Sequence, residues 1–213
     1  MKIFDGLYGF IWNDYSENNC NTYLIDGDRK ILVDPGHRHL FGHVERQLKA
    51  LNLSRDDIDV VIITHGHPDH QEAWEIFGNR TRMAISIEDH ELLKKLAGHY
   101  FKVPEPDFFL REGDLTIGSH HFQVLLTPGH SPGSICLYWP ERKALFAGDV
   151  VFNRGIGRTD LPGGNGDLLK ESIRRISTLD IEYLLTGHGP IVKGADEVQL
   201  NFRMIEDQWF DYL

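Results

Sequence analysis

A six-residue stretch of the chain combines three histidines and one aspartate at spacings that suit metal binding: His65, His67, Asp69 and His70. In an extended segment, residues two apart point to the same side, so His65 and His67 can bind one ion. The intervening proline predicts a turn into a helix over residues 71–77, from which Asp69 and His70 would reach a second position. Imidazole and carboxylate are ligands that zinc, iron and manganese accept. The stretch therefore predicts a metal site.

Two ions need more ligands than this stretch supplies, and three further residues offer them. His130, Asp149 and His188 each follow a predicted strand and have a glycine beside them, which permits a tight turn. Because a carboxylate has two oxygens, Asp149 can face both ions. A lone histidine is more often structural than a ligand. Together with the six-residue stretch, however, these residues favour a two-metal centre in which Asp69 and Asp149 are catalytic.

Other residues capable of chemistry are less well placed. Ser131 and Ser134 flank a candidate ligand, but the sequence offers no orienting partner for either hydroxyl. Cys20 and Cys136 lie in apolar, strand-like contexts. We expect them to be buried reduced thiols rather than a disulfide or a nucleophile. His37 follows a strand end and is a weaker candidate for the wall of the site.

The candidate ligands need a scaffold that brings distant strand ends together. Short apolar runs rich in β-branched residues predict strands at residues 31–33, 60–63, 84–87, 124–126, 135–138, 144–146 and 183–185. Apolar residues recur at helical spacing in residues 40–51, 169–176 and 198–209, and the last set is expected to pack on the core rather than to face a partner. This alternation predicts an α/β architecture of sheets covered by helices, with a site in loops at one end.

Length and charge limit the possible functions. The 213 residues fit one domain, which we expect to span residues 1–213. The net charge of −10 argues against a nucleic-acid partner, because such a partner needs a basic face. With no apolar run of about 18 residues and no apolar signal segment, we expect no membrane span and a cytoplasmic location. A small-molecule substrate is expected, and a homo-oligomer is compatible with these features.

Taken together, these residues resemble the metallo-β-lactamase fold superfamily, which contains hydrolases of many kinds. The resemblance covers nearly the whole chain, from residues 34–36 to residues 187–190. It implies an αββα sandwich, with two facing sheets, helices outside and the site at one edge. It also implies two ligand sets: His65, His67 and His130 for the first metal, Asp69, His70 and His188 for the second, with Asp149 bridging them. Asp34 is expected to steady a ligand loop by hydrogen bonding.

The segment GRTDLPGG at residues 157–164 carries a narrower likeness. It is similar to the short type II glyoxalases (hydroxyacylglutathione hydrolases), and a related stretch occurs in persulfide dioxygenases. Arg158 and Asp160 are expected either to form an ion pair that fixes this loop under the site or to contact substrate, and we favour the ion pair. Asn153 and Arg154 lie just beyond the bridging aspartate, where they line either a substrate groove or the loop surface.

The resemblance implies a binuclear, glyoxalase II-like metallohydrolase that cleaves a thioester or related ester with a hydroxide bridging two divalent ions. Zinc is the expected metal, with iron or manganese as alternatives. Residues 191–196 depart from the glyoxalase pattern, where a threonine-rich stretch is usual, and we expect the long helical domain that helps other glyoxalases hold glutathione to be missing. Three alternatives stay open: a mono-iron persulfide dioxygenase with ligands at His65, His130 and Asp149, a lactonase or β-lactamase-type hydrolase, and a binding protein with a closed zinc site.

Overall fold

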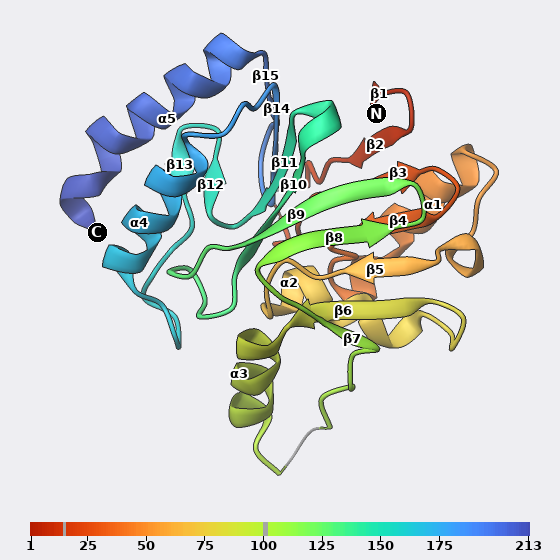
Figure 1. The fold of residues 1–213 in the computed structure, drawn as a ribbon. Coiled ribbons are helices and arrows are strands. Elements are labelled where there is room, and N and C mark those ends of the chain that lie inside the picture. The colour runs from red at the N-terminus through yellow and green to blue at the C-terminus, as the bar shows by residue number, and fades with distance from the viewer. Residues whose placement is uncertain (15, 100–101) are drawn as a thin grey trace.

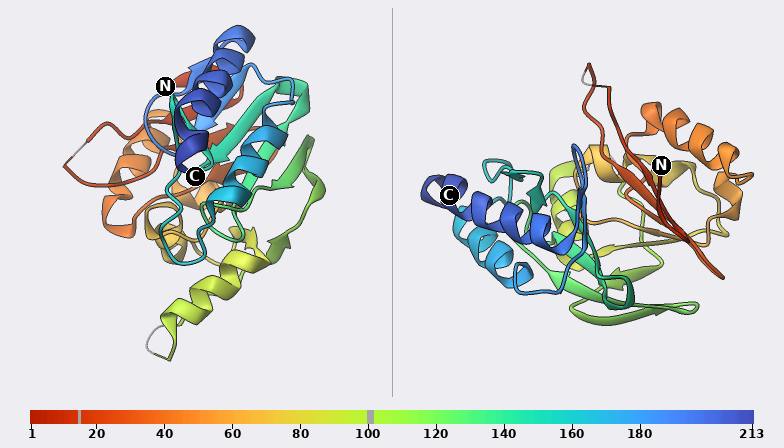
Figure 2. Two further views of the ribbon diagram at one scale, coloured as in Figure 1. Left: turned by 90° about the vertical axis from the view of Figure 1, so that its left-hand side faces the viewer. Right: turned by 90° about the horizontal axis from the view of Figure 1, so that it is seen from above.

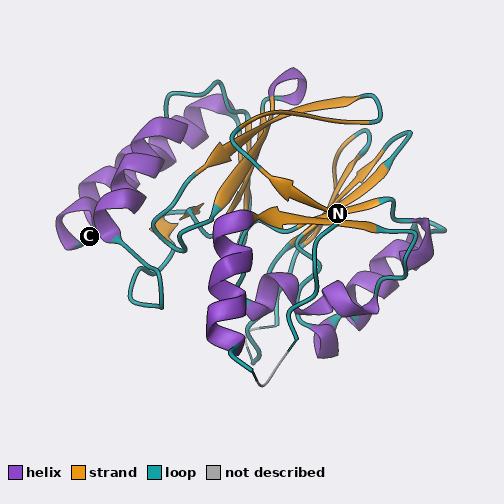
Figure 3. Cartoon of the chain, turned by 60° about the horizontal axis from the view of Figure 1, so that its bottom comes forward, coloured by secondary structure: helices purple, strands orange, loops and turns teal. Residues whose placement is uncertain are grey.

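Two β-sheets packed face to face form the centre of the molecule, and helices cover their outer sides (Figure 1, Figure 3). The computed structural model describes residues 1–14, 16–99 and 102–213. Figure 2 shows helices α4 (Gly166–Ile176) and α5 (Ala195–Trp209) on one flank, with the N-terminal strands and α1 (Gly42–Ala50) on the other. This is the αββα arrangement that the resemblance to the metallo-β-lactamase fold superfamily implies.

The first sheet has seven strands in chain order. They are β1 (Lys2–Phe4), β2 (Leu7–Phe10), β3 (Thr22–Asp26), β4 (Lys30–Val33), β5 (Val60–Ile62), β6 (Arg82–Ser86) and β7 (Phe108–Leu110). Strands β1 to β4 pair antiparallel, and β4 to β7 pair parallel. The three strands predicted in this sheet, at residues 31–33, 60–63 and 84–87, are confirmed to within two residues at either end. Strand β6 ends at Ser86 because its hydroxyl accepts from the Asp89 N–H and caps helix α3 (Ile87–Ala97).

The second sheet has six strands in the order β15-β14-β11-β10-β9-β8. They are β8 (Gly113–Ile117), β9 (His120–Leu126), β10 (Ile135–Trp139), β11 (Ala144–Gly148), β14 (Tyr183–Thr186) and β15 (Val192–Lys193). Only β11 and β14 pair parallel within this sheet, all of whose residues are described. All four strands predicted here are confirmed. A separate short hairpin, β12 (Val151–Phe152) and β13 (Gly155–Ile156), follows β11.

The helix predicted over residues 71–77 is wrong in type, whereas α1, α4 and α5 confirm the other three predictions. The α-helix here, α2, spans only Pro68–Gln71, and a 3₁₀ helix follows at Glu72–Ile76. The Ala73 N–H donates to the Gly36 carbonyl oxygen at 2.8 Å instead of to a carbonyl one turn back. This hydrogen bond to a distant loop favours the tighter winding.

Alternating side chains along the strands fill three apolar layers. In β4, Ile31 and Val33 face the other sheet, whereas Leu32 packs with residues of α1. In β10, Leu137 faces the first sheet and Cys136 packs with residues of α4 and α5. Because each sheet is covered on both faces, its central strands are apolar on both sides, and this explains why the sequence signals them as continuous apolar runs.

The C-terminal apolar stripe packs on the second sheet, as predicted, apart from its last member. Val198, Phe202 and Ile205 are buried in the layer beneath α5. Trp209 is 39% exposed, and its indole N–H donates to the Arg154 carbonyl oxygen at 3.1 Å. In the described part of the chain, no helix combines the length and the apolar character needed to cross a membrane.

Candidate metal centre

All seven residues predicted as metal ligands meet at one edge of the sandwich. The loop after β5 and helix α2 supply four of them, and loops after β9, β11 and β14 supply one each. The seven are His65, His67, Asp69, His70, His130, Asp149 and His188. Because β5 belongs to the first sheet and the other three strands to the second, both sheets contribute to the cluster.

The first predicted ligand set forms a tight group of three imidazoles. The Nε2 atoms of His65 and His130 are 3.2 Å apart, and His67 Nδ1 lies 2.8 Å from His130 Nε2. Two nitrogens bound tetrahedrally to one zinc ion at about 2.0–2.1 Å lie about 3.3 Å apart. The three nitrogen atoms therefore converge at a spacing that fits one ion.

The second predicted set converges in the same way. His188 Nε2 lies 3.2 Å from Asp69 Oδ2 and 3.3 Å from His70 Nε2. His70 Nε2 and Asp69 Oδ2 are 3.9 Å apart. The set combines two imidazoles with one carboxylate, which suits a divalent transition metal.

Asp149 lies between the two sets. Its Oδ1 is 3.2 Å from His70 Nε2, and its Oδ2 is 3.3 Å from His188 Nε2 and 3.6 Å from His130 Nε2. Oδ1 is buried and, despite its closeness to His70, makes no hydrogen bond to any described residue. A buried carboxylate oxygen without a partner is costly unless a cation compensates it. The donor set, its spacing and this orphaned oxygen all fit a two-metal centre.

The pKa values within the cluster reflect the same electrostatics. Burial, together with the neighbouring His130, lowers the pKa of His67 to about 4, and burial holds the pKa of His65 well below its ordinary value. Burial would also lower the pKa of His188, but hydrogen bonds to Asp149 and Asp69 raise it to about 9. Imidazoles that stay neutral are ready for metal binding, and the carboxylates favour positive charge at the centre of the cluster.

Asp34 holds the ligand loop, as predicted. Its Oδ2 accepts from His70 Nδ1 at 2.9 Å and from the Thr64 hydroxyl at 2.7 Å, and its Oδ1 accepts from the Thr64 N–H at 2.8 Å. The Thr64 Oγ1 lies 3.2 Å from His65 Nδ1. One buried carboxylate thus orients a candidate ligand of each set.

Two supporting residues escaped prediction. Asp89 of α3 is fully buried and accepts from the Gly66 N–H at 2.6 Å and from the Gly133 N–H at 2.7 Å, so it joins two ligand loops. Burial raises the pKa of this carboxyl. The Ser86-to-Asp89 spacing signals a helix start in the sequence, but nothing in it signals these two loops. Asn18 donates from Nδ2 to Asp69 Oδ2 at 2.7 Å and has no sequence signal at all.

Several weaker expectations can also be compared with the structure. Cys20 and Cys136 are both buried and free, as expected. The Ser131 hydroxyl does have a partner, since it donates to Asp89 Oδ2 at 2.7 Å, and it is buried in that network. His37 does not line the cavity beside the cluster; its Nδ1 pairs with Glu72 at 2.9 Å instead.

The cavity beside the cluster measures about 460 Å³, a size that suits small-molecule substrates. Phe152, Ile156 and Leu161 supply its apolar lining. Arg158 and Asp160 form a two-pronged ion pair, with N···O distances of 2.7 and 2.6 Å, as favoured from the sequence. The Arg158 carbonyl oxygen accepts from His130 Nδ1 at 2.7 Å, which orients that candidate ligand.

Comparison with known proteins decides the family. The model of the metallo-beta-lactamase superfamily matches residues 15–188. The chain belongs to this superfamily. The superfamily is metal-dependent, and the histidine and aspartate clusters of this chain fit that character.

Relatives within the superfamily include hydrolases. The hydroxyacylglutathione hydrolase GloC of Haemophilus influenzae is 32% identical over 203 residues, which cover 87% of this chain and 92% of that protein. A probable metallo-hydrolase of Methanocaldococcus jannaschii is 32% identical over 187 residues, covering 81% and 89%. The solved structure of TTHA1623 in a di-iron-bound form is similar with a TM-score of 0.70 at 29% identity, covering 91% of this chain and 95% of that chain.

Proposed function

We propose that this protein is a binuclear metallohydrolase that cleaves a thioester or related ester of a small molecule. The observation that carries the proposal is the position of Asp149. Its Oδ2 lies near His130 of the first set and His188 of the second, and its Oδ1 has no hydrogen-bond partner among the described residues. His65, His67 and His130 would hold one ion, and Asp69, His70 and His188 the other. The similarity to a hydroxyacylglutathione hydrolase supports the thioester class.

Each group in the site has a defined task in this proposal. Two bound divalent ions would lower the pKa of water toward neutrality and polarise a carbonyl oxygen. Asp149 would align the two ligand sets, and Asp69, fixed by its hydrogen bond from Asn18, would hold its carboxylate toward the centre. Phe152 and Leu161 would exclude bulk water around the scissile bond. A thiolate leaves readily, so no general acid is required of the chain.

The test is metal analysis of protein purified without added metal, followed by turnover of S-lactoylglutathione. We expect two metal ions per chain and zinc-, iron- or manganese-dependent hydrolysis. A single iron per chain with oxygen uptake on glutathione persulfide would instead identify a persulfide dioxygenase. Hydrolysis of a lactone or a β-lactam, without thioester cleavage, would keep the metal centre but replace the substrate class.

Substitution of the proposed bridging residue gives a second test. Asp149→Asn keeps the side-chain volume but removes the charge, so we expect metal content to fall and turnover to drop by about 100-fold or more. Far-UV circular dichroism should stay unchanged, because the sheets do not depend on this side chain. Asp207→Asn, an exposed substitution on α5, is the matched control. Full turnover in Asp149→Asn would refute the proposed bridging role.

A further inference from the structure

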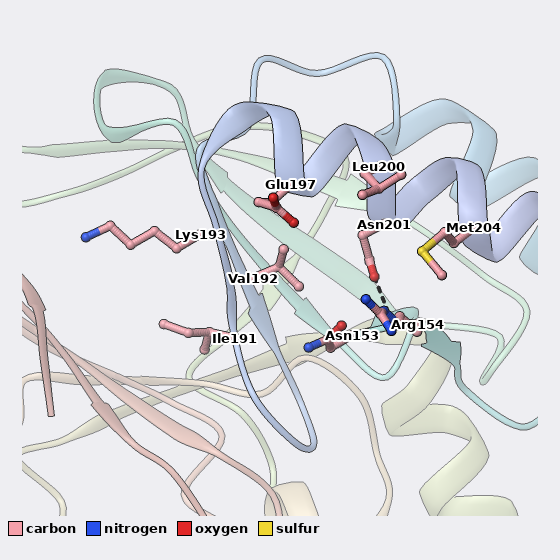
Figure 4. A pocket seen from close by; sticks show the side chains of 9 residues that line it. All are labelled: Asn153, Arg154, Ile191, Val192, Lys193, Glu197, Leu200, Asn201 and Met204. Carbon is pink, nitrogen blue, oxygen red and sulfur yellow. Dashed lines mark hydrogen bonds between the residues drawn. The ribbon is translucent and has the colours of Figure 1, made fainter.

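A second cavity, of about 410 Å³, lies between the turn of the β12–β13 hairpin, strand β15 and helix α5 (Figure 4). The same hairpin walls the cavity beside the metal centre. Phe152 and Ile156 line the metal-side cavity, whereas Asn153 and Arg154, which form the turn between β12 and β13, line the second one. The Phe152 ring packs edge-on against His188, with centroids 5.7 Å apart. The two cavities therefore share the β12–β13 hairpin, in which Arg154 lies two residues beyond Phe152.

The backbone of Arg154 is held in a conformation that its side chain makes unfavourable. Its φ is +61°, in the left-handed region, where a residue with a Cβ is less favourable than glycine. Asn201, which is 3% exposed on α5, accepts from the Arg154 N–H at 2.7 Å and donates to the Phe152 carbonyl oxygen at 3.0 Å. With the indole of Trp209 on the Arg154 carbonyl oxygen, three hydrogen bonds hold this turn. Glycine would adopt this positive φ more readily, so the backbone conformation does not explain why the residue is an arginine. We therefore ask what its guanidinium contacts.

The charges around the cavity indicate what that side chain can do. Arg154 is exposed and takes part in no ion pair with any described residue. The Lys193 ammonium lies 5.4 Å from the ring centroid of Tyr183, and Figure 4 shows this side chain directed away from the other lining residues. Glu197 lies in the first turn of α5, where the helix N-terminus offsets its negative charge. Arg154 is thus the cation available to a ligand in the cavity.

We propose that this second cavity binds a carboxylate on the part of the substrate remote from the scissile bond, and that Arg154 recognises it. The planar guanidinium offers two parallel N–H donors that match a carboxylate. This inference rests on the proposed thioester hydrolase function, because it identifies the substrate as a carboxylate-bearing thioester that spans both cavities.

The kinetic test uses Arg154→Gly, which removes the guanidinium and relieves the left-handed backbone strain. Two substrates share one acyl group: S-lactoylglutathione, which carries carboxylates, and the S-lactoyl thioester of N-acetylcysteamine, which carries none. In the variant, the preference in kcat/KM for the first over the second should fall about 10–100-fold, mainly through KM. A merely structural role would lower both kcat/KM values together and leave the preference unchanged, which would overturn the proposal.

Two further variants sharpen the result. Arg203→Ala removes the same charge from an exposed position of α5 that does not line the cavity, and it should leave the preference unchanged. Glu197→Gln removes the negative charge of the lining and should raise the preference for the carboxylate substrate. The midpoint of urea unfolding for Arg154→Gly should equal or exceed that of the wild type, because glycine adopts a positive φ without strain.

A binding measurement separates this inference from the proposed function. The probe is S-methylglutathione, a thioether that cannot be hydrolysed, titrated calorimetrically into the zinc-loaded protein. Binding that weakens about 10-fold or more in Arg154→Gly supports the cavity even if the wild type cleaves no thioester, in which case only the proposed reaction fails. Thioester turnover with Arg154-independent binding and preference overturns the cavity proposal alone.

Discussion

At the scale of single residues, three candidate ligands, His65, His70 and His130, are oriented by what their second ring nitrogen contacts. His130 presents Nε2 to the centre while Nδ1 donates to the Arg158 carbonyl oxygen, and His70 presents Nε2 while Nδ1 donates to Asp34. His65 reaches the same carboxylate through the Thr64 hydroxyl. Such contacts set which ring nitrogen carries the proton and keep the other free for a metal. Asp34 therefore acts on both ligand sets at once.

Asp34→Asn should weaken metal binding at both positions by about 10–100-fold. The amide oxygen can still accept from the Thr64 N–H, but the amide N–H₂ faces the Nδ1–H of His70 and cannot accept from it. Asparagine also tolerates the positive φ of +54° at this position. Competition with a chromophoric zinc chelator measures both affinities. The unsatisfied buried donor should also lower the free energy of unfolding by about 1–3 kcal/mol.

A matched substitution separates the two ligand sets. Thr64→Val keeps the side-chain shape and removes only the hydroxyl between Asp34 and His65. The zinc affinity of the set that contains His65 should therefore fall, whereas that of the set that contains His70 should stay unchanged. Asp56→Asn, at an exposed position, controls for loss of charge. Equal weakening of both sites by Thr64→Val would show that this hydroxyl does not act through His65.

At the scale of elements, a strand is visible in the sequence where its burial is accompanied by a continuous apolar run. Strands β5, β10 and β11 are buried along their whole length and were predicted from their apolar runs. Edge strand β8 has only one buried residue, Ile117, and no such run, so it was missed. The sequence does not predict helix α3, because Ile87 continues the apolar run of the preceding strand, although Ser86 is a helix-cap residue.

The candidate site shows the same division between local and long-range signals. The seven ligand candidates can be recognised in the sequence because they follow predicted strands, four of them within residues 65–70 and three beside a glycine. Asp89 and Asn18 were not found, because Asp89 binds backbone groups of residues 66 and 133 and Asn18 binds a side chain 51 positions away. Such contacts arise only when the sandwich closes. Cap and strand-end signals are local, whereas the supporting network is a property of the folded chain.

An ion pair that links α4 to the second sheet makes part of the stability depend on pH. Glu112 Oε2 accepts from the Leu126 N–H at the end of β9, at 2.6 Å, and Arg175 of α4 contacts both Glu112 and the Leu126 carbonyl oxygen. Partial burial would raise the pKa of Glu112, but Arg175 and the Leu126 N–H lower it below its usual 4.5. A carboxyl with a lowered folded-state pKa stabilises the protein above its unfolded-state value, and this contribution is lost as pH falls.

Glu112→Gln should therefore lower the free energy of unfolding at pH 7 by about 0.2–1 kcal/mol, a small value because both partners are more than one-third exposed. The amide oxygen still accepts from the Leu126 N–H, so the difference isolates the charge. Urea unfolding at several pH values should show the gap to wild type closing as pH falls below 4.5 through the lowered pKa. Glu171→Gln, on the exposed face of α4, should show no such gap. A gap that persists at pH 2 would contradict the electrostatic explanation.

At the scale of the whole molecule, the ligand groups join two halves that have separate apolar layers. One layer lies under α1 against the first sheet, another under α4 and α5 against the second, and a third between the sheets. The ligand loops come from both sheets, so the metal centre lies at the boundary, here called the seam, between the two sheet-and-helix halves. Metal binding at this seam should stabilise the fold without creating it.

Removal of metal with a chelator should therefore lower the unfolding temperature while leaving the far-UV circular dichroism at 25 °C unchanged. A metal that binds only the folded state, at 100 times its Kd, adds about 2.7 kcal/mol. For a chain of this length that corresponds to roughly 5–10 °C. Calorimetric scans with zinc, with chelator and with zinc restored measure the shift and its reversibility, and Asp149→Asn should lose most of it. The apolar layers hold the sheets independently, so loss of secondary structure on chelation would contradict a preformed scaffold, and the absence of any shift would contradict metal binding across the seam.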